Sequence, residues 1–333
     1  MKILVTGSAG FLGYHLARAL SHEKENHVVC IDSGIRGEFD DLYKSLISKP
    51  NVEHHGIDLS ERNNLDILPE NIDVIYHLAA LNGTQNFYER PFEVMRCCTL
   101  PTLNLIQKYA PLKYLRRFIY AGTSESYAST ITRFEWQIPT AEDVPLSIDD
   151  IFNPRWSYAA SKIHGEIATI TGCKQFGTEF SIIRYHNAYG PRMGYQHVVS
   201  DFYERARDGV FALYGYEDTR SFIYIDDAIR ATIAVAEADG ALGQVVNVGG
   251  SREITMLELG RLMMKVAGLK GKIERHPSPP GSVKRRCPDL AKLRAITGFE
   301  ERWSLEDGLK ETAAFYLGSP RRNSLAAPRT ARY

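Results

Sequence analysis

The sequence predicts an α/β protein in which helices cover both faces of a parallel sheet and a smaller lobe follows. Three observations support this fold class. Short apolar runs alternate with amphipathic stretches in the first half, a glycine-rich turn follows the first run, and the alternation weakens after about residue 190. Ligands of such sheets bind beyond the carboxyl ends of the strands. Reactive side chains are therefore expected directly after the apolar runs.

Strand and helix patterns alternate along the first 187 residues. Six apolar runs are predicted strands: Lys2–Thr6, His27–Ile31, Val52–Asp58, Asp73–Leu78, Arg116–Ala121 and Phe180–Tyr185. Helical spacing of apolar residues predicts the helices Phe11–Leu20, Pro91–Tyr109 and Tyr158–Phe176. We expect a first domain over residues 1–187, to which some later segments return, and a smaller lobe over residues 188–317 that ends in a helix near Leu305–Leu317. Residues 318–333 are predicted to form a disordered tail.

The composition is that of an ordinary globular protein, with 44% hydrophobic and 24% charged residues in a chain of 333. Forty basic and forty acidic residues balance, so no overall charge favours nucleic acid or a membrane surface. An anionic ligand therefore needs local cationic groups. The five cysteines and ten histidines show no metal-binding spacing, which predicts reduced thiols and no metal. The start resembles a strand rather than a signal peptide, and no apolar run reaches about 18 residues. We expect a cytoplasmic protein.

A glycine-rich turn with the spacing GxxGxxG lies between the first predicted strand and the first predicted helix. Gly7 permits the tight turn, Gly10 lets the backbone approach a pyrophosphate, and Gly13 allows the helix to pack closely on the strand. Backbone N–H groups at the helix start, at Phe11 and Leu12, would face the phosphates. A glycine-rich turn without a ligand is the alternative. The strand before the turn and the acid after the next strand favour a dinucleotide.

Two acidic residues end the second and third predicted strand regions. The Asp32 carboxylate can accept hydrogen bonds from adenosine ribose hydroxyls and would repel a 2′-phosphate, which favours NAD over NADP. Arg36 lies nearby in the sequence and weakens this preference. Asp58 can either contact the adenine edge or act as a turn residue.

A second set of residues carries acid–base chemistry. Tyr158 and Lys162 are four residues apart and so share one face of a predicted helix. A nearby ammonium group and a cationic nicotinamide would favour the phenolate, which could then take the proton of a sugar hydroxyl while hydride leaves the same carbon. Lys162 would also hold the nicotinamide ribose. Thr123, at the end of the fifth predicted strand, could polarise the reacting oxygen; as a single residue it could merely cap a turn.

In this order and spacing, the motifs resemble the extended short-chain dehydrogenase/reductase family, and within it the nucleotide-sugar epimerases, dehydratases and decarboxylases. The resemblance rests on the glycine motif, Asp32, AGTSES at 121–126, YAASK at 158–162 and the later segments 184–193, 219–227 and 286–289. It covers about residues 1–317. It implies a Rossmann-type fold with a substrate lobe, NAD as cofactor, and a nucleotide-sugar as substrate, with a UDP-sugar as the first choice.

The resemblance also assigns residues to the two ligands. Cofactor contacts are implied for Leu78, Ala79, Ala80 and Tyr185. Substrate contacts are implied for Asn82, Ser124, Asn187, Arg220 and Arg286. Bidentate guanidinium groups suit phosphate oxygens, so the two arginines would supply the local positive charge for a diphosphate. Without the resemblance, an ordinary surface ion pair is the alternative for each arginine.

The resemblance implies oxidation of the sugar, expected at C4, to a keto intermediate with NADH retained. C4 epimerisation of a nucleotide-linked hexose or hexuronic acid is our first expectation, because YAASK is ordinary among epimerases. Glu125 keeps a decarboxylase of the UDP-glucuronate type and a 4,6-dehydratase open, because relatives of both kinds carry a glutamate there. The dehydratases, however, usually have extra sequence after the NxYGP motif, and the decarboxylases usually differ at YAASK.

Two hypotheses from other classes remain. One is a simple NAD(P)-dependent reductase, which would exchange its cofactor in each turnover. The other is a non-catalytic binding protein on the same fold. Relatives commonly dimerise through two helices that match Pro91–Tyr109 and Tyr158–Phe176, so a homodimer is expected.

Overall fold

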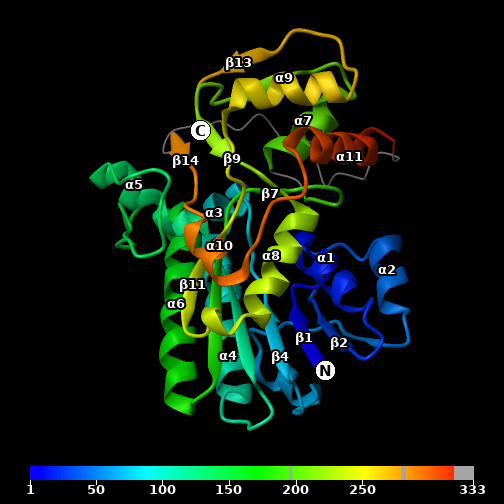
Figure 1. Cartoon of the computed structure of the whole chain (residues 1–333), viewed down its shortest axis with the longest axis vertical. Coiled ribbons are helices and arrows are strands. Elements are labelled where there is room, and N and C mark those ends of the chain that lie inside the picture. The colour runs from blue at the N-terminus through cyan, green and yellow to red at the C-terminus, as the bar shows by residue number, and fades with distance from the viewer. Residues whose placement is uncertain (195–196, 279–282, 319–333) are drawn as a thin grey trace.

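The computed structural model describes residues 1–194, 197–278 and 283–318. Figure 1 shows a lower part built on one central sheet and an upper lobe formed mainly by later segments of the chain. Apart from Gly318, which ends the last helix, the predicted tail lies outside the described residues.

The central sheet is parallel and has seven strands in the order β11-β6-β5-β4-β1-β2-β3. Its strands are β1 (Lys2–Thr6), β2 (His27–Ile31), β3 (Val52–His55), β4 (Val74–His77), β5 (Arg117–Thr123), β6 (Glu179–Tyr185) and β11 (Gln244–Val248). The strand order reverses direction between β1 and β4, which creates the switch point where ligands bind in this class of fold. The predicted doubly wound α/β fold is confirmed. β11 comes from beyond residue 187 and pairs with β6.

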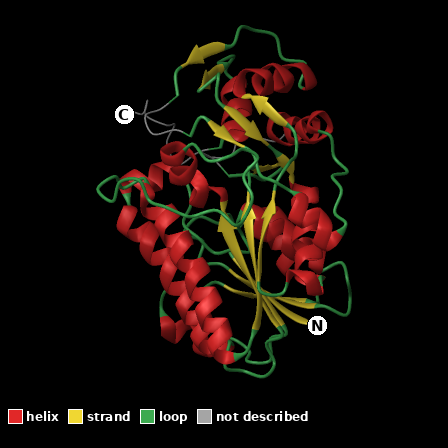
Figure 2. Ribbon diagram, turned by 60° about the vertical axis from the view of Figure 1, so that its left-hand side comes forward, coloured by secondary structure: helices red, strands yellow, loops and turns green. Residues whose placement is uncertain are grey.

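Helices cover both faces of the sheet (Figure 2). One face carries α1 (Phe11–Leu20) and α8 (Ile225–Glu237); the other carries α4 (Pro91–Tyr109) and α6 (Trp156–Phe176). Alternate strand residues serve the two faces. Ile3 and Val5 belong to the core with α1 and α8, whereas Leu4 belongs to the core with α4 and α6. The hydrophobic runs are continuous because both faces are buried.

The smaller lobe combines short strands with three helices. Its helices are α7 (Val198–Ala206), α9 (Met256–Val266) and α11 (Leu305–Gly318). Its strands pair as β7 (Ala188–Tyr189) with β10 (Ile223–Tyr224), β8 (Ala212–Tyr214) with β13 (Glu274–His276), and β9 (Thr219–Ser221) with both β12 (Glu253–Thr255) and β14 (Arg285–Arg286). The remaining elements are α2 (Asp41–Ile47), α3 (Thr84–Glu89), α5 (Ala128–Phe134), α10 (Ala291–Thr297) and the 3-10 turns Arg62–Ile67, Ser124–Tyr127 and Asp239–Ala241.

Most predicted elements have the expected bounds, and the differences lie at strand ends. The third and fourth strands stop at His55 and His77, earlier than predicted, so Asp58 lies in the following turn. The fifth strand extends to Thr123, because Thr123 still pairs with Tyr185 of β6. Thr123 therefore sits in the sheet rather than after it.

Within the described ranges, no helix has both the length and the apolar character needed to cross a bilayer. The same ranges contain no group of three histidine, cysteine or acidic side chains arranged to hold a metal ion. All five cysteines are buried and free.

Candidate active site

The glycine-rich turn connects the carboxyl end of β1 to the start of α1. Gly7 has a φ of +69°, which favours glycine, and a Cβ on Gly13 would lie only 2.0 Å from the Gly7 carbonyl oxygen. Gly10 precedes α1 without capping it through a side chain, and no acidic residue lies in the first turn. The N–H groups of the first turn can therefore serve an anionic ligand, as expected for the pyrophosphate of a dinucleotide.

Asp32 lies beside this turn at the end of β2. Its carboxylate accepts hydrogen bonds from the backbone N–H of Ala9 at 3.0 Å and of Gly34 at 2.8 Å, and burial raises its pKa. Arg36 points away from this carboxylate. Its Nη2 atom lies 3.4 Å from Nε2 of His197, in the smaller lobe. A carboxylate at the ribose position, with Arg36 engaged at His197, fits NAD rather than NADP.

Asp58 contacts the backbone of Ser60 and the side chain of Arg96. Its carboxylate accepts a hydrogen bond from the backbone N–H of Ser60 at 2.8 Å and pairs with Arg96 at 3.0 Å. Burial acts to raise the pKa of Asp58, but these bonds outweigh it and lower the pKa. This geometry matches the turn-residue alternative, and the adenine contact stays a prediction.

Thr123, Tyr158 and Lys162 meet at the carboxyl end of β5. Thr123 lowers the pKa of the Tyr158 phenol, and Nζ of Lys162 donates to the carbonyl oxygen of Ala121 at 2.9 Å. Nζ of Lys162 lies 5.9 Å from the centroid of the Tyr158 ring. The first turns of α6 thus bring phenol and ammonium groups to the strand that carries the threonine hydroxyl.

The pKa of Tyr158 in the protein alone is raised, whereas a lowered pKa is expected from the sequence when the cofactor is bound. Burial raises the pKa of Tyr158, and the Cys98 thiol and the Glu125 carboxylate raise it further. Burial also lowers the pKa of Lys162. Desolvation of the phenol dominates in the protein alone, so the phenolate expected from Lys162 together with a cationic nicotinamide stays a prediction. Of the groups present, Thr123 and Arg36 lower the pKa of Tyr158.

Glu125 forms the centre of a charged cluster two residues beyond Thr123. One carboxylate oxygen accepts a hydrogen bond from Nη1 of Arg286 at 2.9 Å, and the other lies 3.5 Å from Nη2 of Arg155. Burial acts to raise the pKa of Glu125, but the two guanidinium groups outweigh it and lower the pKa. Glu125 is thus an ionised carboxylate that can accept a proton.

The predicted substrate residues lie around this cluster. Nη1 of Arg286 also contacts Ser124 Oγ at 3.4 Å, while Asn187 donates to the Ser221 carbonyl oxygen at 2.9 Å. Arg220 donates to the backbone carbonyls of Thr219, Val283 and Lys284 and lies 3.7 Å from Asp218. Nε atoms of Arg155 and Arg286 are buried and have no hydrogen-bond partner among the described residues. Such donors can receive the oxygens of an anionic ligand.

All of the predicted site residues line a single cleft of about 2240 Å³ between the sheet and the smaller lobe. This volume exceeds the roughly 300–1,000 Å³ of an ordinary single-ligand pocket, so it can hold a dinucleotide and a nucleotide-sugar together. The residues predicted to contact the cofactor all line this cleft: Gly7, Gly10, Phe11, Leu12, Gly13, Asp32, Asp58, Leu78, Ala79, Ala80, Tyr158, Lys162 and Tyr185. Glu125, Thr123, Ser124, Asn82, Asn187, Arg220 and Arg286 line the part nearer the smaller lobe.

Among the residues of this cleft that sequence reasoning missed are Arg155 and Phe87. Arg155 lies one helical turn before Tyr158, and a cation at that spacing was an available signal. Phe87, in α3, stacks on the Tyr158 ring with centroids 5.1 Å apart and an interplanar angle of 14°. No local motif marks Phe87, because the contact depends on how α3 folds back over α6.

A Rossmann-type sheet with a dinucleotide turn, and a Thr123, Tyr158 and Lys162 set at its switch point, defines a member of the short-chain dehydrogenase/reductase class. More specifically, the chain belongs to the NAD dependent epimerase/dehydratase family, which matches residues 3–249. Its cofactor is NAD.

Relatives and solved structures agree with this membership. The chain is 32% identical to a UDP-N-acetyl-alpha-D-glucosaminuronate decarboxylase of Bacillus cytotoxicus, over 95% of this chain and 97% of that protein. It is 29% identical to UDP-glucuronic acid decarboxylase 1 of Xenopus tropicalis, over 95% of this chain and 72% of that protein. Among structures, UDP-glucuronic acid 4-epimerase of Bacillus cereus, solved with UDP-glucuronic acid and NAD, superposes with a TM-score of 0.85 at 28% identity, covering 96% and 99% of the chains.

Proposed function

We propose that the protein is an NAD-dependent decarboxylase of a UDP-hexuronic acid, which oxidises C4 of the sugar, releases C6 as carbon dioxide and yields a UDP-pentose. The observation that carries the proposal is the ionised Glu125, fixed by Arg286 and Arg155 two residues from Thr123. The names of the relatives support the substrate class, since two of those described above are hexuronate decarboxylases.

The charges of the cleft suit such a substrate. Arg155, Arg220 and Arg286 supply three positive charges, and Glu125 and Asp218 remove two of them. A diphosphate brings about two negative charges, so it would be held by guanidinium groups rather than by the neutral chain as a whole. The buried Nε–H groups of Arg155 and Arg286, which have no partner among the described residues, can donate to phosphate oxygens.

In the first step, the phenol oxygen of Tyr158 takes the proton of the C4 hydroxyl, and the Thr123 hydroxyl orients that oxygen. When bound, NAD supplies the acceptor for the hydride from C4. Its positive charge also favours the phenolate of Tyr158, which opposes the effect of burial. Phe87 covers one face of the Tyr158 ring and excludes water from it.

Oxidation at C4 leaves the C6 carboxylate β to a ketone. The C5–C6 bond can then break, with its electron pair passing to the C4 carbonyl oxygen, and one proton is added at C5. The UDP-pentose forms when the hydride taken in the first step returns to C4 and the Tyr158 hydroxyl gives its proton back to the C4 oxygen. The hydroxyls of Thr123 and Tyr158 would stabilise the charge that develops on that oxygen. The ionised Glu125 disfavours a second carboxylate close by, and the formation of neutral carbon dioxide relieves that repulsion.

Dehydration fits the same residues less well. Loss of the C6 hydroxyl needs an acid beside the departing oxygen in addition to a base at C5. Glu125 is ionised and can act only as the base, and its neighbour at position 124 is a serine.

C4 epimerisation of the same UDP-hexuronic acid is the second candidate. It is favoured by the high structural similarity to the UDP-glucuronic acid 4-epimerase. Epimerisation requires the 4-keto sugar to turn its other face to the cofactor, and no step of it requires a fixed carboxylate at position 125.

Incubation of the protein with UDP-glucuronic acid, UDP-N-acetylglucosaminuronic acid and UDP-glucose, followed by mass spectrometry and NMR, tests the proposal. A decarboxylase yields a product lighter by carbon dioxide from at least one uronic acid and none from UDP-glucose. An unchanged mass with an inverted C4 supports the epimerase instead, and loss of water supports a dehydratase. Accumulation of free NADH would indicate a simple dehydrogenase.

Glu125→Gln divides the two leading candidates. The amide has nearly the same shape but no charge, so it removes the repulsion that release of carbon dioxide relieves, and a decarboxylase should lose turnover by about tenfold or more. An epimerase should change little. Ser124→Ala is the matched control, since it alters the neighbouring hydroxyl and leaves the carboxylate in place. Full decarboxylase activity in Glu125→Gln would remove the carboxylate from the mechanism.

A further inference from the structure

Arg192 connects the smaller lobe to the glycine-rich turn. It follows Gly190 and Pro191 in the chain, and only 4% of it is exposed. Nη1 donates to the carbonyl oxygens of Ala9 at 3.0 Å and Gly10 at 3.2 Å. The other nitrogens are also occupied, because Nη2 donates to the Glu38 carbonyl oxygen at 2.6 Å and Nε to the Asp40 carboxylate at 2.8 Å.

These contacts fix the orientation of the peptide units that face the cofactor. A trans peptide is planar, so its C=O and N–H point in opposite directions. The Gly10 carbonyl oxygen accepts bonds from Arg192 and from the backbone N–H of Tyr14 at 3.0 Å. The N–H of the same peptide unit belongs to Phe11, a residue of the cleft in the first turn of α1. Arg192 thus fixes the carbonyl side of the peptide unit between Gly10 and Phe11, whose N–H faces the cleft.

The backbone of Arg192 indicates that its side chain is required at this place. Its φ is +65°, a left-handed conformation that favours glycine, yet the chain has an arginine here. The side chain supports this conformation through its four bonds and through the Tyr14 ring, whose centroid lies 4.4 Å from the guanidinium carbon.

We infer that Arg192 is a positioning residue for the dinucleotide. By bracing the Gly10 carbonyl from the smaller lobe, it keeps the Phe11 N–H directed at the pyrophosphate and so keeps the cofactor bound between oxidation and reduction of the sugar. The inference requires only that the cofactor is a dinucleotide and holds for either reaction proposed above.

Arg192→Lys tests it, with Arg117→Lys as the matched control. A lysine keeps the charge but cannot reach Ala9, Gly10 and Glu38 together. Arg117 is another buried arginine, 7% exposed, whose Nη1 donates to the carbonyls of Val235, Ala236 and Ala238. Arg117 does not line the cleft, so Arg117→Lys should lower the stability of the fold and leave NAD binding unchanged.

The measurements are calorimetric titration with NAD, the NAD content of the purified protein, and the midpoint of thermal unfolding. We expect Arg192→Lys to bind NAD at least about tenfold more weakly, and Arg117→Lys to unfold at lower temperature with unchanged NAD affinity. Unchanged affinity in folded Arg192→Lys would overturn the inference, as would an equal loss in Arg117→Lys. If Arg192→Lys does not fold, Asp40→Asn takes its place, because it removes the charge that pairs with Nε while the asparagine oxygen can still accept from the Tyr43 N–H at the start of α2. Weaker NAD binding by this variant supports the inference, and unchanged binding contradicts it.

Discussion

At the scale of single residues, the proposed chemistry depends on the phenol of Tyr158, whose pKa is raised in the protein without cofactor. Burial raises the pKa of Tyr158, and Glu125 adds to this effect. The Thr123 side chain works in the opposite direction and lowers this pKa. A cationic cofactor ring would favour the phenolate, so we expect the base to be prepared when the cofactor binds.

Tyr158→Phe should reduce turnover by about 10²–10⁴-fold, because it removes the hydroxyl that we propose exchanges the C4 proton. NAD affinity should remain within about threefold of the parent, a difference of roughly 0.7 kcal/mol, since the ring and its stacking on Phe87 are retained. Steady-state kinetics with a UDP-hexuronic acid and titration with NAD provide the two values.

Tyr109→Phe is the control for this change. Tyr109 is buried at the far end of α4, where its hydroxyl donates to the Pro69 carbonyl oxygen at 3.0 Å. Activity of Tyr158→Phe equal to that of the control would exclude the phenol as the proton carrier.

At the scale of elements, the sequence predicted correctly those strands, turns and helices whose signals lie close together in the chain. The unit from β1 through the glycine turn to α1 has the predicted bounds, because strand, turn and helix signals lie within 20 consecutive residues. The pairing of Glu125 with Arg286 could not be predicted from spacing, since the two residues are 161 positions apart and meet only when the smaller lobe folds over β5. Only the family resemblance placed both residues near the substrate.

A hydrogen-bond chain through His77 shows how three elements fix the cofactor side of the cleft. The Thr6 hydroxyl oxygen accepts from the backbone N–H of Leu78 and of Ala79, each at 3.1 Å, so its hydrogen is left for Nδ1 of His77 at 2.8 Å. Nε2 of His77 must then carry its proton and donate to Thr102 of α4 at 2.9 Å. The neutral imidazole is therefore built into the junction of β1, β4 and α4.

This chain predicts a loss of stability in acid. Burial lowers the pKa of His77 from 6.5 to about 3. Between these values the unfolded chain binds more protons than the folded one, so the free energy of unfolding falls as the pH drops below 6.5. At pH 5 His77 alone should account for roughly 2 kcal/mol, at 1.4 kcal/mol per unit.

Urea denaturation at pH 7 and pH 5 measures this effect. His77→Gln should lose part of the difference between the two pH values, whereas His22→Gln, at an exposed position, should keep all of it. Buried His186, with a pKa lowered to about 3, contributes in the same direction and remains in both variants. Equal pH dependence in the His77 and His22 variants would show that His77 does not carry it.

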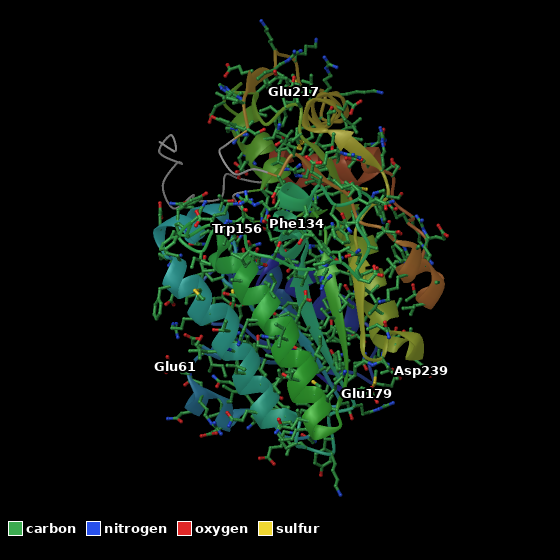
Figure 3. All side chains as sticks on the ribbon, turned by 90° about the vertical axis from the view of Figure 1, so that its left-hand side faces the viewer. Glu61, Phe134, Trp156, Glu179, Glu217 and Asp239 are labelled. Atoms are coloured by element: carbon green, nitrogen blue, oxygen red, sulfur yellow. The ribbon has the colours of Figure 1, made fainter. Side chains whose placement is uncertain are left out.

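At the scale of the whole molecule, α4 and α6 leave an apolar surface on the side away from the sheet. The two helices lie side by side in Figure 3, with Trp156 at the upper end of α6. Phe92, Met95, Leu100 and Leu103 of α4 and Ile167 of α6 are exposed there, Phe92 by 79% and Ile167 by 56%. Ile167 lies nine residues after Tyr158, about half a turn away around the helix, so the outer face lies directly behind the catalytic one.

We propose that this surface binds a second copy of the chain, because contiguous apolar patches on a helix pair mark association sites. Replacing both Leu103 and Ile167 by arginine should convert a dimer to a monomer, since burial of two unpaired charges opposes association. Turnover should fall as well, because α6 loses the support behind Tyr158. Light scattering after size-exclusion chromatography should give twice 37.5 kDa for the parent and a single chain for the variant.

Leu42→Arg provides the comparison for the dimer. Leu42 is 44% exposed on α2, which packs on β3 at the other edge of the sheet, so its replacement should leave the mass at two chains. A monomeric parent, or a Leu103→Arg, Ile167→Arg variant that stays dimeric, would show that the chain does not associate through α4 and α6. The apolar stripe would then need a different occupant, and the rigidity of α6 would have to come from its contacts with α4 and β5 alone.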